Sequence, residues 1–80
     1  MENRVAIIGI IVENTESVES LNGILHEYAK YLIGRMGIPY NKKNINIISI
    51  AVDAPNETIN ALSEKIGKLD GVSAQVAYSK

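Results

Sequence analysis

The run RVAIIGIIV, from Arg4 to Val12, decides the fold of this chain. It is nearly continuous in aliphatic residues and rich in β-branched ones, which favours a strand that is covered on both faces. A strand of this kind lies in the middle of a sheet. The rest of the chain must therefore supply strands to flank this run and helices to cover it.

Two segments outside this run are typical of helices. The polar residues from Glu13 to Glu16 can cap a first helix. Apolar residues then recur at helical spacing, namely Val18, Leu21, Ile24, Leu25 and Tyr28. A second helix is predicted after Pro55, with Asn56 as its cap. Its apolar face is made by Ile59, Leu62, Ile66 and Leu69.

Three more segments have strand character. The first runs from Tyr31 to Ile38 and is ended by Pro39, which points to an edge strand or to the end of a strand. The second runs from Ile45 to Asp53. Its two sides are Ile48, Ile50 and Val52 on one and Ile45, Ile47, Ser49 and Ala51 on the other. The last runs from Val72 to Tyr78 with half-buried alternation, after a turn in which Gly71 can adopt a positive φ.

This order of elements predicts an α+β domain of the ferredoxin-like class, βαββαβ, over residues 1–80. In that topology two helices pack on one face of a four-stranded antiparallel sheet, and the first and third strands lie in the middle. The other face stays open. It would carry Val5, Ile7 and Ile11 or their alternates, together with Ile45 and Ile47. Because soluble monomers seldom expose a large apolar patch, we expect a homo-oligomer, a dimer or tetramer that pairs through sheet faces or edges.

Composition argues against several classes of function. The net charge is -1, from 8 Lys plus Arg and 9 Asp plus Glu, and no basic stripe suits nucleic acid. The chain has no cysteine, which excludes disulfides and thiolate chemistry. Its longest apolar run is far short of the ~20 residues that span a bilayer, and no signal-peptide pattern opens the chain. We expect a cytoplasmic protein without membrane contact or direct nucleic-acid binding.

The most unusual segment is GRMGIPY, from Gly34 to Tyr40, in which glycines and a proline frame a lone arginine. A charge such as Arg35 in mid-strand is costly unless it reaches water, a carboxylate or an anionic ligand. Gly34 and Gly37 would let a ligand or another backbone approach. The alternative is a salt bridge between subunits at a sheet edge. Met36 and Ile38 are expected in the core.

Three further residues complete the candidate site. Tyr31 and Tyr40 can either cover the rim of an interface or line a pocket beside Arg35. His26 is the only histidine, and a lone histidine is more often a surface or interface residue than a metal ligand. The predicted ligand-binding set is therefore Arg35, Gly34, Gly37, Tyr31, Tyr40 and His26, with no metal site and no assigned cofactor. No nucleophile and base can be paired, so an enzyme is not expected.

Four segments resemble the iron-only hydrogenase system regulator family: Ile8–Glu13, Ile24–Tyr28, Gly34–Tyr40 and Leu69–Val72. The similarity extends over essentially the whole chain, and Gly34–Tyr40 is its most specific part. It implies a small ACT-like domain with a regulatory or accessory role near hydrogenase maturation, and a maturation or regulatory protein as partner. Glu13 to Thr15 replace the acidic residue and glycine with which many ACT domains hold an amino acid, so amino-acid sensing is not implied.

Two functions are compatible with these observations. The first is an oligomeric sensor whose ligand lies at a subunit interface beside Arg35. The second is a protein–protein interaction module without a small ligand, which would bind its partner through the sheet or through the loop at Lys42 and Lys43.

Overall fold

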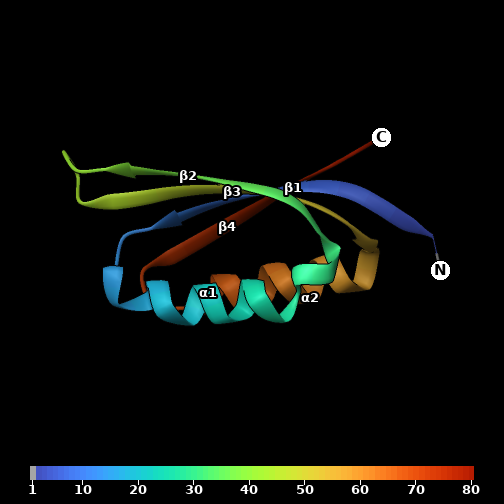
Figure 1. The fold of residues 1–80 in the computed structure, drawn as a ribbon, viewed down its shortest axis with the longest axis horizontal. Helices are drawn as coiled ribbons and strands as arrows, with labels where there is room; N and C mark the ends of the chain where they lie inside the picture. Colours follow the sequence, from blue (N-terminus) through green and yellow to red (C-terminus); the bar gives the residue numbers. More distant parts are fainter. Residues whose placement is uncertain (1) are drawn as a thin grey trace.

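The structure is a computed structural model that describes residues 2–80. Two helices cover one side of a four-stranded sheet (Figure 1). The strands are β1 (Asn3–Val12), β2 (Leu32–Tyr40), β3 (Ile45–Pro55) and β4 (Val72–Tyr78). The helices are α1 (Val18–Glu27) and α2 (Asn56–Gly67), and single 3-10 turns, η1 (Thr15–Ser17) and η2 (Ala29–Tyr31), flank α1.

The sheet has the topology that the order of elements predicts. All pairings are antiparallel and the strand order is β2-β3-β1-β4, so the first and third strands lie in the middle. The ferredoxin-like βαββαβ fold is thereby confirmed. Each middle strand alternates between buried residues that face the helices and exposed residues that face away. The core therefore lies between the sheet and the two helices.

Buried aliphatic residues from both layers make up this core. The sheet contributes Ala6, Ile8, Ile10, Val12, Ile48, Ile50, Val52, Ala54 and Val72, and the helices contribute Leu21, Leu25, Ile59, Leu62 and Ile66. The helical residues recur every three or four positions, as a face that packs on a sheet requires. The predicted apolar faces of both helices are confirmed.

A compact junction ties the end of β1 to the start of β4. Gly71 has a φ of 69°, and a Cβ atom there would lie 2.6 Å from Cβ of Asn14. The backbone N–H of Glu13 donates to the carbonyl of Gly71 at 2.7 Å, and the hydroxyl of Ser17 donates to the carbonyl of Asp70 at 2.6 Å. The side chain of Asn14 accepts from the backbone N–H of Glu16 at 3.0 Å. Asn14 therefore caps the 3-10 turn η1 that leads into α1, whereas Ser17, the N-cap of α1 itself, makes no side-chain cap hydrogen bond. The predicted glycine turn is present.

Several element boundaries differ from those predicted. Tyr31 belongs to η2, and the second strand continues through Pro39 to Tyr40, because β2 is an edge strand that needs no hydrogen bond from the proline nitrogen on its free side. Strand β3 extends to Pro55. Asn56 is the first residue of α2 rather than its cap, and its side chain accepts from Nη1 of Arg4 at 3.4 Å.

The expectation that Met36 and Ile38 lie in the core is wrong, since they are 62 % and 52 % exposed. A bulge between Leu32 and Gly34 shifts the register of β2 against β3. One extra residue inverts the phase of every later side chain in a strand. Leu32 therefore faces the helices, but Met36 and Ile38 face away from them.

The uncovered side of the sheet is strongly apolar. We call it the open sheet face, and its large exposed side chains are Val5, Ile7, Ile11, Ile33, Met36, Ile38, Tyr40 and Ile47. The first strand is thus covered on one face only within a single chain, contrary to the expectation of cover on both. The predicted open face on the middle strands is present, and the edge strand β2 enlarges it.

Candidate functional site

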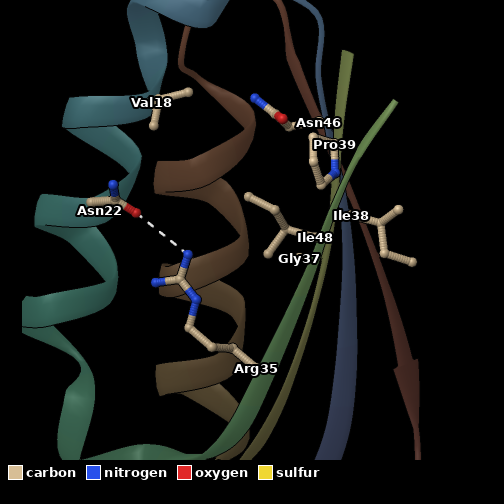
Figure 2. Close-up of a pocket in the computed structure, with 8 residues that line it drawn as sticks. All are labelled: Val18, Asn22, Arg35, Gly37, Ile38, Pro39, Asn46 and Ile48. Carbon is tan, nitrogen blue, oxygen red and sulfur yellow. Dashed lines mark hydrogen bonds between the residues drawn. The ribbon is translucent and has the colours of Figure 1, made fainter. Parts of the chain in front are cut away.

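The inverted phase of β2 turns Arg35 toward the helices. Arg35 is paired with Ile50, a core residue, so both side chains lie on the helical side of the sheet. Its Nη2 atom donates to Oδ1 of Asn22 on α1 at 3.4 Å (Figure 2). This distance is long for an N–H···O hydrogen bond. The guanidinium is exposed and is held only loosely by its neighbour.

Among the residues described, Arg35 has no acidic partner. The one ion pair within residues 2–80 joins Lys65 to Glu27, with Nζ and Oε2 3.3 Å apart. The other arginine, Arg4, is well engaged: its guanidinium stacks 4.3 Å from the centre of the Tyr78 ring and donates to the carbonyl of Ser79 at 3.1 Å. Arg35 therefore retains donors that an anion could use.

A cleft of about 300 Å³ lies between α1 and the hairpin formed by β2 and β3 (Figure 2). We call it the α1–hairpin cleft. It is lined by Val18, Asn22, Arg35, Gly37, Ile38, Pro39, Asn46 and Ile48. The side chain of Ile38 points away from α1, toward the open sheet face, as its register predicts (Figure 2).

The cleft combines an apolar floor with polar groups. Ile48, Pro39 and Val18 supply aliphatic surface. Gly37 has no side chain, and a Cβ atom there would contact Cγ1 of Ile48 at 4.0 Å, so the glycine keeps the floor open. Arg35 supplies a positive charge and Asn46 an amide. This arrangement can hold an anionic group and cover an apolar one at the same time.

The predicted site residues fall into separate parts of the structure. Arg35 and Gly37 line the cleft. Gly34 and Tyr40 are paired with Ala51 and Ile45, which places them on the open sheet face. The two remaining residues lie elsewhere: His26 is exposed on α1, and Tyr31 packs its ring 6.4 Å from that of Tyr28.

Sequence reasoning missed Asn22, Asn46, Val18 and Ile48 as cleft residues. The two asparagines belong to no recognisable motif and lie 24 positions apart in sequence, on different elements. Asn46 and Ile48 could have been found only from the register of β3 against β2, which pairs Asn46 with Pro39 and Ile48 with Gly37.

Two further observations concern metal binding and the opposite end of α1. The residues described contain no cluster of three or more histidine, cysteine or acidic side chains that could hold a metal ion. At the other end of α1, Lys65 from α2 donates to Glu27 and lies 5.1 Å from the centre of the Tyr28 ring. Hydrogen bonding to Tyr28 and to Glu27 raises the pKa of Lys65 above its ordinary value.

In residues 2–80 no helix is both long enough and apolar enough to cross a membrane.

Two solved structures show the fold alone. One is a formyltetrahydrofolate deformylase from Pseudomonas putida KT2440, at 11% identity and a TM-score of 0.65, in which 91% of this chain matches 28% of that one. The other is the de novo designed protein Foldit4, at 24% identity and a TM-score of 0.62, over 99% of this chain and 98% of the design. No curated protein matches this chain.

A third structure and a family model are much more informative. Uncharacterized protein TM1266 from Thermotoga maritima has a TM-score of 0.94 and 31% identity over 99% of this chain and 100% of that one. The family model that is described as "TM1266-like: Iron-only hydrogenase system regulator, putative" matches residues 4–76. Those residues include both sides of the α1–hairpin cleft and almost all of the sheet. The chain therefore belongs to the TM1266-like family, which that model describes.

Proposed function

We propose that this chain is an oligomeric ligand-sensing domain with a regulatory rather than a catalytic role. Copies associate through the open sheet face, and a small ligand binds in the α1–hairpin cleft of each copy. The observation that carries the sensing role is Arg35, which points into the cleft and meets no acidic partner among residues 2–80. A guanidinium in that position can bind an anionic ligand through paired hydrogen bonds.

Association is supported by the composition of the open sheet face. It presents eight large exposed apolar side chains. The strand register places a single charged residue, Asp53, on this side of the paired strands, near one end of β3. Four strands about 4.8 Å apart and about 25 Å long give a face of about 500 Å². Two such faces would bury about 1,000 Å², the lower end for a specific interface.

The positions of the two surfaces on β2 suggest how a ligand could influence assembly. Arg35 and Gly37 contact the cleft, whereas Met36 and Ile38 belong to the open sheet face. Edge strand β2 pairs only with β3. A ligand that bridges Arg35 and α1 would fix the distance between the hairpin and the helix. Because β2 also carries Met36 and Ile38, the ligand would thereby fix the position of residues that contact the other copy.

A second function is favoured by the open sheet face itself. The domain could use this face to bind a hydrogenase maturation or regulatory protein, without any small ligand. An apolar patch of this extent marks a protein–protein contact as readily as a homo-oligomeric one. The two functions differ in one property, because only the sensor requires a vacant and accessible Arg35.

Thermal unfolding with small ligands tests the sensor. The protein is melted with a panel of carboxylates, inorganic phosphate, amino acids and divalent cations, and its mass is measured in the same buffers by analytical ultracentrifugation. The sensor predicts an oligomer and a melting temperature that one class of compound raises in the wild type but not in Arg35→Ala. The matched control is Arg4→Ala, which removes the same charge outside the cleft. A strictly monomeric mass, or a flat screen together with a co-purifying partner protein, would refute the sensor.

A further inference from the structure

We infer that the α1–hairpin cleft binds a small monocarboxylate with a short aliphatic chain. This inference rests on the proposed sensing function and names the class of its ligand. It depends on three features of the cleft: one partly free arginine, an apolar floor, and a second polar position at Asn46.

The charged end of the cleft selects a singly charged, planar anion. Arg35 is the only basic residue among the eight that line the cleft. Its single hydrogen bond within residues 2–80 is the 3.4 Å contact with Oδ1 of Asn22. A guanidinium offers two parallel N–H donors that match the two oxygens of a carboxylate. Asn22 can rotate to donate its amide N–H to the same group, since an asparagine is both donor and acceptor.

A phosphate group fits this environment less well. Phosphate sites usually combine several cationic side chains with backbone N–H groups from a glycine-rich loop or a helix start. Here the lining holds one cation, and the lysines of the turn between β2 and β3, Lys42 and Lys43, lie outside the lining. One positive charge balances one carboxylate and leaves the second charge of a phosphate uncompensated.

The remaining surface selects an aliphatic chain. Next to Arg35, the floor is made by Ile48, Pro39 and Val18, with Gly37 leaving room above Ile48. Nothing on this floor is charged. The volume of about 300 Å³ is at the lower limit for ligand pockets. A ligand of that size has a carboxylate and a chain of a few carbons. Asn46 lines the same cleft as a second polar group, with an amide that can donate and accept hydrogen bonds.

The test titrates the intact protein with a homologous series of acids, followed by amide signals in two-dimensional NMR. The probes are acetate, butyrate and isovalerate, with isovaleramide as the neutral analogue and inorganic phosphate as the competing anion. Isovalerate should shift the amides of Gly37, Asn22 and Asn46 in a saturable way. Affinity should rise about fourfold for each added methylene group, since burying one contributes about 0.8 kcal/mol. Isovaleramide should bind at least about tenfold more weakly, because it lacks the charge-assisted hydrogen bonds.

Variants locate the effect. Arg35→Gln keeps a polar side chain without the charge and should weaken isovalerate at least about tenfold. Gly37→Val fills the floor and should abolish the dependence on chain length. Arg4→Gln is the matched control and should bind like the wild type. The inference is overturned if isovalerate causes no saturable shifts, if its Kd is unchanged in Arg35→Gln, or if phosphate binds the cleft more tightly than isovalerate.

These outcomes are separable from failure of the sensor. If phosphate or another anion binds at Arg35, the carboxylate class is wrong and the sensing function stands. If isovalerate binds in the cleft but sedimentation gives a monomer with and without it, the ligand class is correct and the oligomeric sensor is wrong.

Discussion

Replacing Ile7 by aspartate should separate the copies of this protein without unfolding them. Ile7 lies on the middle strand β1 and is 51 % exposed on the open sheet face. Its neighbours across the sheet are Ala51 on β3 and Ala77 on β4, both small. The isoleucine therefore projects beyond its surroundings, which is the geometry of a side chain that inserts into a partner.

The expected loss can be worked from its exposure. Burying a whole isoleucine side chain contributes about 1.5–3 kcal/mol. With 51 % of Ile7 still exposed, the partner can bury about half, or about 0.8–1.5 kcal/mol per copy. The substitution occurs in both copies of a dimer, so the loss is about 1.5–3 kcal/mol. That change raises the Kd of the dimer about tenfold to hundredfold. A short carboxylate cannot reach water from the interface, and its desolvation adds to this loss.

Sedimentation equilibrium over a range of protein concentrations measures the effect directly. Ala61→Asp is the matched control, because it adds the same charge at an exposed position on α2, away from the open sheet face. Circular dichroism verifies that both variants keep the fold. If Ile7→Asp associates as tightly as Ala61→Asp, the open sheet face is not the contact between copies, and the reasoning from its apolar surface fails.

Three further predictions concern stability and are measured by urea unfolding at one protein concentration. Gly71→Ala should lower the free energy of unfolding by about 1–3 kcal/mol, since a Cβ at a φ of 69° would lie 2.6 Å from Cβ of Asn14. The control is Gly23→Ala, where a Cβ meets nothing within 4 Å. A loss in Gly71→Ala no greater than that in the control would contradict this prediction. Leu21→Ala should cost about 2–5 kcal/mol because the side chain is fully buried, and a cost near zero would place α1 outside the core. Hydrogen bonds to Tyr28 and Glu27 raise the pKa of Lys65 above 10.5, so its stabilising effect is complete below pH 10.5 and disappears as pH rises through the folded-state pKa. The stability difference between wild type and Lys65→Met should shrink over that rise, and a difference that grows with pH would reverse the assignment.

The order of helices and strands could be predicted because it follows from local signals. Alternation along Ile45–Asp53 divides its residues between the two sides of a strand without reference to any neighbour. The helical spacing of Leu21 and Leu25, and of Ile59, Leu62 and Ile66, indicates which faces are buried. Gly71 indicates a turn with a positive φ, which other residues adopt only with strain. Each of these patterns is complete within a few residues, so the βαββαβ order and the open face could be predicted.

The location of the site depends on contacts between elements that are distant in sequence. If alternation ran unbroken from the half-buried Leu32, Met36 and Ile38 would lie against the helices and Arg35 on the open sheet face. The bulge before Gly34 inverts that phase. In the segment Gly34–Tyr40 one set of alternate residues contains Met36, Ile38 and Tyr40, and the other contains the charged Arg35. The local pattern therefore favours burial of the first set, which is the reverse of the observed arrangement. The inversion caused by the bulge also brings Arg35 beside Asn22, 13 positions away in sequence. A contact of this kind depends on the pairing of β2 with β3 and on the packing of α1 over both, which no short stretch of sequence encodes.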